Sequence, residues 1–353
     1  MPAGDAVAND TEQSFPARMT ERIACVLGSV LEPSRPVALI NYPNHQNPGD
    51  NAIWLGTQAV LRSLNVPVGY TSNWSSFSAP AMRSAIGDGP LLLNGGGNFG
   101  DLYAGQQMLR EHILEHCKER RIVQLPQSIY FREERNLERM RRLCAGHPDF
   151  TLMVRERRSQ EIARTAFDVP VLMCPDMAFG LGALARPAGP RTDLLWIGRA
   201  DAERVERSPP PRDVPSCDWL TADLADDMSE PTQRVLRLNR RLIEFTRGDA
   251  DGAGRRQRAL SWTFGILADA WVRRGLDLVS SATVLVTDRL HAHVFAILLG
   301  VPHVVLDNSY GKVRSTFETW THDSALATWA STTEEALQAA APLLSRHAAI
   351  PWV

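Results

Sequence analysis

The sequence lacks a long apolar run, an excess of one charge sign, and any pairing pattern among its few cysteines. The longest apolar run, Val294–Val301, is far too short to cross a bilayer. The chain carries 38 Lys and Arg against 40 Asp and Glu, so it has no global basic field that would hold a nucleic acid. Its five cysteines lie singly and are odd in number, which argues against a disulfide framework or a zinc site.

A secretory signal is also missing from the first residues. The segment MPAGDAVANDTEQ has neither a basic nor an apolar region. Together with the scattered cysteines, this leads us to expect a cytoplasmic protein. The 353 residues suffice for two domains, and 44% apolar with 22% charged residues is typical of a folded, soluble chain.

Short apolar segments alternate with segments of helical periodicity along most of the chain. The expected strands are 36–43, 90–94, 121–128, 150–156, 169–176, 193–198, 283–288 and 301–307. The expected helices are 16–31, 49–64, 106–119, 134–146, 158–167, 261–282 and 289–300. This alternation predicts βαβ units and mainly parallel sheets. A change to Pro-rich and Arg-rich sequence near 183–192 predicts a boundary between two α/β halves, 1–183 and 184–353, that face a cleft. Residues 246–258 are expected to form an exposed loop.

A glycine-rich segment follows the second expected strand. In LLLNGGGNFGDLY, residues Gly95, Gly97 and Gly100 have the spacing G-x-G-x-x-G of a dinucleotide site. The next expected strand ends without the carboxylate that would bind a ribose, so NAD or FAD binding is disfavoured. Two interpretations remain: a tight strand-to-helix turn without a ligand, or a turn whose backbone amides face one.

The segment LVTDRLHAHVFA places Arg289 and His291 where an apolar strand gives way to an apolar helix. Burying these groups is costly unless each has a partner or a ligand. His291 and His293 invite a metal interpretation, but residues two apart on a helix point about 200° apart and cannot chelate one ion. We therefore expect one to face the cleft and the other the interior, and we predict no metal site. A structural role for His291 is the alternative.

Other polar residues follow expected strands at the same sheet edge. Arg155, Arg199 and Lys312 are each more often surface residues when alone, but together they would suit a ligand with several negative charges. The loop after the first strand carries His45, Asn47 and Asp50, with Asp50 as the expected helix N-cap.

Read in order, six segments resemble the polysaccharide pyruvyl transferase family: NPGDNAI, LLLNGGGNFGD, LPQSIYF, VRERRS, CPDMAF and VTDRLHAHVFAILLGVPHVVLDNSYGK, which span about residues 38–320. The resemblance implies an α/β fold with two Rossmann-like domains facing a cleft, similar to GT-B glycosyltransferases. It also implies transfer of pyruvate from phosphoenolpyruvate, the donor substrate, to a sugar of an exopolysaccharide or cell-surface glycan precursor, with formation of a cyclic ketal and release of phosphate. No cofactor is expected.

The resemblance also implies roles for individual residues. His291 is the expected catalytic residue, and the N-terminal half is expected to bind the acceptor sugar while the C-terminal half binds the donor. The expected donor-binding residues are Arg289, Lys312, Arg155, Arg199, Asn308 and Tyr310. The expected acceptor-binding residues are His45, Asn47, Asp50, Gly95, Gly96, Gly97, Asn98 and Asp101. A lipid-linked acceptor would add peripheral association with the inner face of the membrane.

The chemistry of the reaction agrees with these residue types. A histidine titrates near neutral pH and could protonate the methylene carbon of the donor or deprotonate a sugar hydroxyl. Several cations could neutralise the donor's carboxylate and phosphate. Two alternatives stay open at this point: a nucleotide-sugar-dependent glycosyltransferase on the same fold, and a non-catalytic carbohydrate-binding protein.

Overall fold

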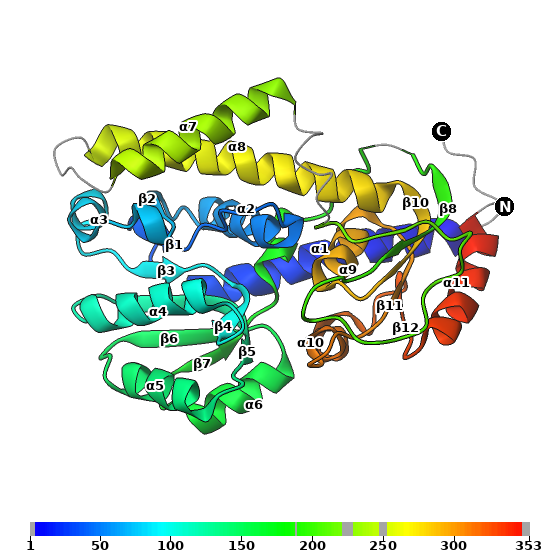
Figure 1. Ribbon diagram of the computed structural model, residues 1–353, viewed down its shortest axis with the longest axis horizontal. Helices are drawn as coiled ribbons and strands as arrows, with labels where there is room; N and C mark the ends of the chain where they lie inside the picture. The colour runs from blue at the N-terminus through cyan, green and yellow to red at the C-terminus, as the bar shows by residue number, and fades with distance from the viewer. Residues whose placement is uncertain (1–3, 188, 221–228, 247–252, 348–353) are drawn as a thin grey trace.

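The computed structural model of the protein describes residues 4–187, 189–220, 229–246 and 253–347, which form two parallel sheets with helices around them (Figure 1). The N-terminal sheet has the order β2-β1-β3-β5-β6-β7, and β4 pairs with β5. Its strands are β1 (Val37–Ile40), β2 (Val68–Ser72), β3 (Leu91–Leu93), β4 (Gly96–Gly100), β5 (Ile122–Tyr130), β6 (Phe150–Val154) and β7 (Val171–Met173). All of its strand pairs are parallel, with registers such as Leu92 opposite Val123.

The C-terminal sheet is smaller and has the order β12-β11-β10-β8-β9, again with parallel pairs. Its strands are β8 (Thr192–Ile197), β9 (Ser216–Cys217), β10 (Ala282–Thr287), β11 (His303–Val305) and β12 (Ala327–Trp329). The expected α/β class with two Rossmann-like sheets is therefore confirmed. The division at residue 183 into an acceptor half and a donor half stays a prediction.

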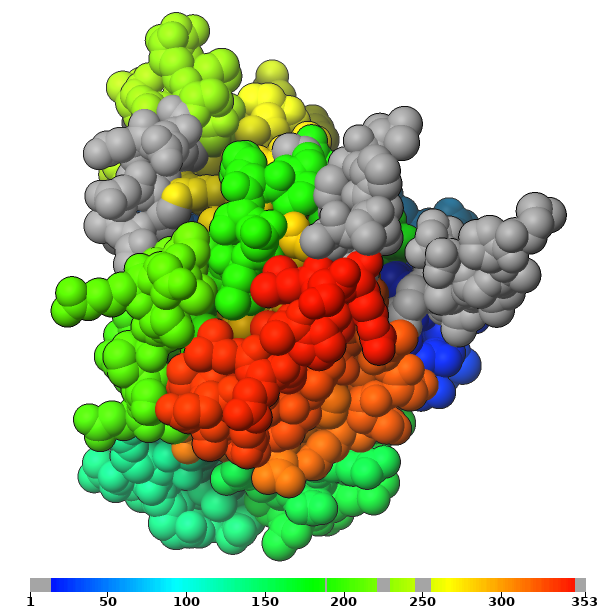
Figure 2. Space-filling view, turned by 90° about the vertical axis from the view of Figure 1, so that its right-hand side faces the viewer, coloured from blue at the N-terminus to red at the C-terminus, as the bar shows by residue number. Residues whose placement is uncertain are grey.

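Helices cover both sheets. They are α1 (Gly4–Gly28), α2 (Pro48–Ser63), α3 (Ala79–Ile86), α4 (Ala104–His116), α5 (Glu134–Ala145), α6 (Arg157–Ala166), α7 (Glu230–Thr246), α8 (Ala253–Ser280), α9 (Leu290–Leu299), α10 (Lys312–Thr316) and α11 (Thr333–His347). Short turns add η1 (Trp74–Ser76), η2 (Met177–Leu181) and the π-helical η4 (Phe317–Thr321). In Figure 2, α11, in red, covers the near side of the C-terminal half, while α7 projects at the top.

One hydrophobic core joins the two halves of the molecule. It includes Leu27 of α1, Trp54 of α2, Phe264 of α8 and Phe295 of α9, all of which are buried. The long helix α8 packs against α2 and β2 of the N-terminal half and against α9 and β10 of the C-terminal half. Because these contacts are apolar and extensive, the two sheets are held at a defined separation.

Several sequence predictions of local structure were wrong. Helix α1 begins at Gly4 and runs through Pro16, although proline was expected to start it. Helix α7 occupies sequence for which no element was expected, and the start of α8 lies in the expected loop 246–258; residues 247–252 of that loop lie outside the described part. The segments β2, β12 and α11 were not predicted at all. Each is short or polar on one face, so its apolar periodicity is weak.

The glycine-rich segment does not turn directly into a helix. Gly96–Gly100 forms β4, and α4 begins only at Ala104. Gly96 and Gly100 have φ of 136° and 132°, which side chains rarely adopt, and a Cβ at Gly100 would lie 1.8 Å from the Tyr130 carbonyl oxygen. A Cβ at Gly95 would likewise lie 2.7 Å from the Pro126 carbonyl oxygen. These glycines therefore let the chain lie against β5, so the expected direct turn from strand to helix was wrong, whereas the expectation that the segment faces a ligand stays a prediction.

The start of α2 also differs from expectation. Its N-cap is Asn47, whose side-chain oxygen accepts a hydrogen bond from the Gly49 amide at 3.1 Å. Pro48 occupies the first helical position, which suits its fixed φ and missing amide hydrogen. Asp50 lies in the first turn instead of capping it, where its charge still favours the helix dipole.

Among the helices of the described residues, none combines the length and the apolar character that crossing a membrane requires.

Candidate active site

A polar cavity of about 390 Å³ lies where the carboxyl ends of strands from both sheets meet. This edge is the usual ligand position in open α/β sheets. Ten residues predicted for the site line it: His45, Asn47, Asp50, Gly97, Asn98, Arg155, Arg199, Arg289, His291 and Lys312. Eight further residues complete the lining: Gln46, Tyr103, Gln106, Asp201, Glu203, Trp219, Leu220 and Leu290.

Five predicted residues do not line the cavity. Gly95 and Gly96 pack at β5, as described above. Asp101 accepts hydrogen bonds from the backbone amides of Arg132 and Glu133, both at 2.9 Å, and so anchors the start of α5. Asn308 lies behind the cavity and donates to Glu203 at 3.1 Å. Tyr310 is buried, with Lys312 Nζ 5.1 Å from its ring centroid. Asn308 and Tyr310 therefore support the cations rather than face the cavity.

Asp176, which follows β7, connects an arginine and a histidine of the cavity. Its Oδ2 lies 2.5 Å from Arg155 Nη1 and 3.4 Å from His291 Nε2, while its Oδ1 accepts from the Ala178 amide at 2.8 Å. Both Asp176 and Arg155 are 1% exposed. Burial alone raises the pKa of Asp176, but His291 and Arg155 outweigh it and hold this pKa far below its ordinary value. Asp176 is therefore a carboxylate that can orient both partners.

His291 is held from its other side by the start of α2. A Cβ at Gly49 would lie 2.1 Å from His291 Nδ1 and 2.4 Å from its Cγ. Only a glycine lets the α2 backbone approach the imidazole this closely. The ring is thus confined between the Gly49 backbone and the Asp176 carboxylate, with its edge in the cavity.

His293 behaves differently, as predicted for the second histidine of the segment. Its Nδ1 lies 2.6 Å from His303 Nε2, and its Nε2 lies 2.9 Å from Thr321 Oγ1. Burial lowers the pKa of His293 well below its ordinary value and that of His303 to about 4, so both rings are neutral. His291 faces the cavity and His293 faces the interior, which confirms that prediction.

Two cations meet beside Gly97. A Cβ at this position would lie 3.1 Å from Arg155 Nη2 and 3.4 Å from Lys312 Nζ. Arg155 comes from the end of β6 and Lys312 from the start of α10, so this pairing joins the two halves. Arg155 Nε donates to Ser128 at 2.9 Å, and Trp320 donates to the Arg155 carbonyl at 2.7 Å. Gly97 thereby leaves room for two positive charges at one wall of the cavity.

Carboxylates hold the remaining cations. Arg199 pairs with Asp201 and Glu203, each at 2.9 Å, and Lys312 Nζ lies 2.5 Å from Glu203. Burial raises the pKa of Glu203, but Lys312 and Arg199 reverse this and bring it to about 2. Burial lowers the pKa of Lys312 to about 8, although Glu203 opposes the shift.

Arg289 completes this network. It contacts the Asp218 carboxylate at 2.6 Å and Asp201 at 3.2 Å, and its guanidinium lies 5.9 Å from the Trp219 ring. The site thus combines four cations with four buried or half-buried carboxylates. Fixed cations with oriented partners are suited to bind an anion and stabilise charge that develops on it.

The rest of the lining includes amides, ring surfaces and the carboxylate of Asp50. Asn98 Oδ1 accepts from Arg110 at 2.8 Å and Gln127 at 2.9 Å, which fixes its orientation. Tyr103, which is 41% exposed, donates to Glu203 at 2.9 Å. Asn47 Nδ2 donates to Asp50 at 2.7 Å, and His45 Nε2 lies 3.6 Å from Asp50. Such neutral and aromatic groups are suited to sugar hydroxyls and ring faces.

The sequence prediction missed the acidic partners. Asp176 lies in the CPDMAF segment, and Asp201 and Glu203 follow the strand that carries Arg199. A search for carboxylates directly after strands would have identified these three. Asp218 follows the two-residue strand β9, which has no apolar pattern to reveal it.

Comparison with known proteins gives consistent results. The family profile described as polysaccharide pyruvyl transferase matches residues 47–310. Pyruvyl transferase 1 of Schizosaccharomyces pombe is 33% identical over 302 residues, covering 82% of this chain and 71% of that protein. EpsO of Bacillus subtilis is 30% identical over 283 residues, covering 79% of this chain and 84% of that protein. A crystal structure of the Klebsiella pneumoniae protein KP1_0663 shares the fold, with a TM-score of 0.56, 15% identity, and coverage of 89% of this chain and 99% of that one.

Proposed function

Because this chain belongs to the polysaccharide pyruvyl transferase family, we propose that it transfers pyruvate from phosphoenolpyruvate to two hydroxyls of a sugar, forming a cyclic ketal and releasing phosphate. The observation that carries the proposal is the convergence of His291, Arg155, Arg289 and Lys312 on one cavity, with Asp176 between the first two. The sugar would belong to a precursor of a surface or exported polysaccharide.

The donor has two anionic groups, a carboxylate and a phosphate. Arg155 and Lys312, which meet beside Gly97, would bind one of them, and Arg289 with Arg199 the other. Each of these cations has a carboxylate partner. Bound phosphoenolpyruvate would therefore share the N–H groups of the cations with Asp176, Asp201, Glu203 and Asp218. Before phosphoenolpyruvate binds, these carboxylates keep the guanidinium planes oriented.

The reaction requires a proton at the methylene carbon of the donor. In this proposal His291 delivers it, C2 gains oxocarbenium character, and a sugar hydroxyl attacks C2. The C–O bond to phosphate then breaks, and the second hydroxyl closes the ring at the same carbon. Of the two hydroxyl protons, one restores His291 and the other leaves with phosphate. Asp176 would stabilise the imidazolium and keep the ring aligned.

The acceptor would lie against the wall formed by His45, Asn47, Asp50, Asn98 and Tyr103. These side chains present imidazole, amide, carboxylate and phenol groups to the cavity. Asp50 would accept a hydrogen bond from a sugar hydroxyl. Binding of the acceptor in this way requires no metal or cofactor.

The proposal is tested by phosphate release from phosphoenolpyruvate in the presence of candidate sugar acceptors. His291→Ala is expected to reduce turnover by about 10²–10⁴-fold, the range for loss of a general acid, while donor affinity in calorimetry stays nearly unchanged. The control is His322→Ala, an exposed histidine outside the cavity lining, which should retain wild-type turnover. Absence of phosphate release with every acceptor, together with stabilisation by a nucleoside diphosphate sugar instead of phosphoenolpyruvate, would replace this proposal with a glycosyltransferase.

A further inference from the structure

The helices α7 and α8 form an antiparallel hairpin along one side of the N-terminal half, at the top of Figure 1. The active site does not account for this hairpin. Thr263 of α8 donates to Asn239 of α7 at 2.9 Å, and Ser261 and Gln257 bind Thr71 of β2. One face of the hairpin is therefore fixed to the sheet, and the opposite face is directed away from the body of the molecule.

That outward face carries two exposed apolar side chains. Asn239 of α7 and Thr263 of α8 face each other across the hairpin. Leu238 and Trp262 each come one residue earlier in their helix, which corresponds to a rotation of about 100° around the helix axis. Because the two helices are antiparallel, both side chains point to the same side of the hairpin. Leu238 is 42% exposed and Trp262 is 54% exposed. Two exposed apolar side chains on the same side of one hairpin form a patch, which is more informative than a single exposed residue.

Arginines surround these two side chains. Arg255 and Arg258 lie seven and four residues before Trp262, and Arg234 and Arg241 lie four before and three after Leu238, so all four are on the same helix faces and are exposed. Arg234 also pairs with Glu230 at 2.5 Å, an exposed contact that leaves most of its charge available to a polyanionic surface. We call these six residues the hairpin outer face: Arg234, Leu238, Arg241, Arg255, Arg258 and Trp262.

The hairpin is strongly basic within a slightly acidic chain. Its described residues 229–246 and 253–262 contain seven arginines and two glutamates, a formal charge of +5. The whole chain has a net charge of −2, so the remainder carries −7. Positive charge is therefore concentrated on one projecting element, where it would act on a large anionic surface.

We propose that the hairpin outer face docks on an anionic lipid surface. Arginine head groups would contact lipid phosphates while Trp262 and Leu238 enter the boundary between head groups and acyl chains. A nucleic acid or an acidic polysaccharide would engage the arginines but leave the two apolar side chains in water. The combination of exposed cations with an exposed indole therefore favours lipid.

The position of the hairpin connects this surface to the cavity. Asn239 lies 3.4 Å from the Asn44 side chain, in the loop that carries His45 and Asn47 into the acceptor wall. This inference rests on the proposed function. If the protein is a pyruvyl transferase, the placement of the hairpin favours an acceptor sugar that is carried on a membrane lipid. A protein docked through the hairpin would hold its acceptor loop near the membrane surface.

The test is cosedimentation of the full chain with vesicles that contain phosphatidylglycerol, compared with vesicles of phosphatidylcholine alone. We expect binding to the anionic vesicles that weakens with salt. Arg255→Gln/Arg258→Gln should weaken partitioning about 30-fold, from ~1 kcal/mol for each arginine near an anionic surface. Trp262→Ala should also weaken binding to the anionic vesicles. This loss should persist in high salt, because salt screens the arginine charges but leaves the apolar contribution.

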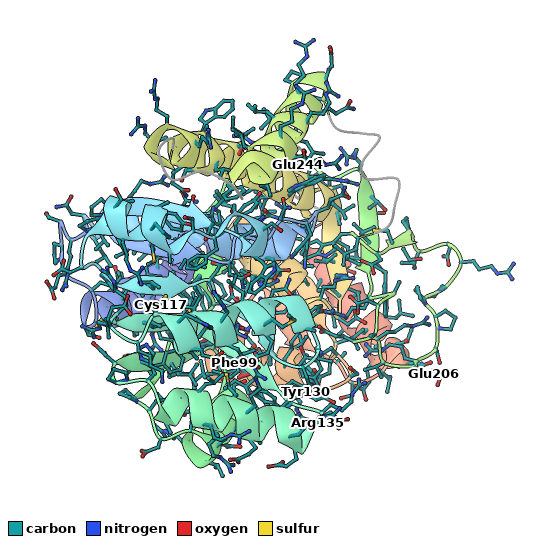
Figure 3. All side chains as sticks on the ribbon, turned by 60° about the vertical axis from the view of Figure 1, so that its left-hand side comes forward. Phe99, Cys117, Tyr130, Arg135, Glu206 and Glu244 are labelled. Atoms are coloured by element: carbon teal, nitrogen blue, oxygen red, sulfur yellow. The ribbon has the colours of Figure 1, made fainter. Side chains whose placement is uncertain are left out.

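The matched control is Arg135→Gln/Arg142→Gln on α5. Both arginines are exposed helix residues, and Figure 3 shows Arg135 at the opposite end of the molecule from Glu244 of α7. This control should bind vesicles like the wild type. Equal effects of the two double variants, or binding to a soluble polyanion without binding to vesicles, would overturn the proposal.

Vesicle binding is measured without donor or acceptor, so its result is independent of the reaction. Phosphate release with a water-soluble acceptor should be the same for the wild type and Arg255→Gln/Arg258→Gln. Loss of vesicle binding with normal phosphate release would confirm the docking role alone. Normal vesicle binding without any phosphate release would instead contradict the proposed function.

Discussion

The contact between Gly49 and His291 allows the geometry of the site to be perturbed by a single methyl group. In Gly49→Ala, the new Cβ would lie 2.1 Å from His291 Nδ1, 2.4 Å from Cγ and 2.6 Å from Cβ, and no other neighbour is as close. Ordinary contact begins at 3.4 Å, so the two groups must separate by 3.4 − 2.1 = 1.3 Å. Gly49 lies in the first turn of α2, which Trp54 and Ile53 anchor in the core, so His291 moves, together with the start of α9 that carries its Cβ.

This displacement affects catalysis more than donor binding. A shift of about 1 Å in a reacting group costs on the order of 10²-fold in rate. The three atoms nearest to the added methyl all belong to His291 and none to Arg155, Arg289 or Lys312, so the affinity for phosphoenolpyruvate should change by no more than about twofold. We therefore expect kcat to fall about 10²-fold while the donor dissociation constant stays near its wild-type value.

Steady-state phosphate release gives kcat, and calorimetry gives donor affinity. The matched control is Gly105→Ala, because Gly105 is also the second residue of a helix, α4, and a Cβ there would meet nothing within 4 Å. The control should keep wild-type kcat. If Gly49→Ala retained kcat within about threefold of the wild type while folding normally, confinement of His291 by α2 would not matter for turnover, and this reasoning would be refuted.

Three further outcomes follow from the same network. Asp176→Asn should lower the free energy of unfolding in urea by about 3–5 kcal/mol, because Arg155 loses its buried counter-charge, whereas the exposed control Asp323→Asn should cost under ~1 kcal/mol. Donor affinity should fall as the pH rises above 8, because Lys312, with its pKa lowered to about 8, loses the ammonium charge there; Lys312→Arg should abolish this fall in calorimetry. Glu203→Gln should strengthen donor binding in calorimetry, because the donor no longer competes with a carboxylate for Lys312, and weaker binding would contradict this competition.

The glycine-rich segment shows where local sequence reasoning reaches its limit. G-x-G-x-x-G describes spacing, and glycine serves equally in a phosphate-binding turn and in a strand pressed against its neighbour. In this protein the glycines belong to a strand pressed against its neighbour. Backbone oxygens of β5 occupy the positions that side chains at Gly95 and Gly100 would need. That contact depends on a strand more than twenty residues later, so nothing within the motif could reveal it.

Helix α7 illustrates a different limit. Its sequence, EPTQRVLRLNRRLIEFT, contains apolar residues at helical spacing, but no helix was predicted there, between the Pro-rich stretch and the expected loop at 246–258. Tertiary packing against α8 stabilises the helix and orients its arginines outward. The hairpin outer face exists only because two helices are aligned side by side.

The sequence alone determined the order of most strands and helices, and it identified the cations at their ends. Apolar periodicity is a local property, and residues after parallel strands share one sheet edge whatever the details of packing. Only the tertiary structure decided the partners of those cations: Arg155 meets Asp176 across 21 residues, Arg289 meets Asp218 across 71, and Lys312 meets Glu203 across 109. These pairs depend on how two sheets are placed relative to one another, and that placement results from core packing distributed over the whole chain.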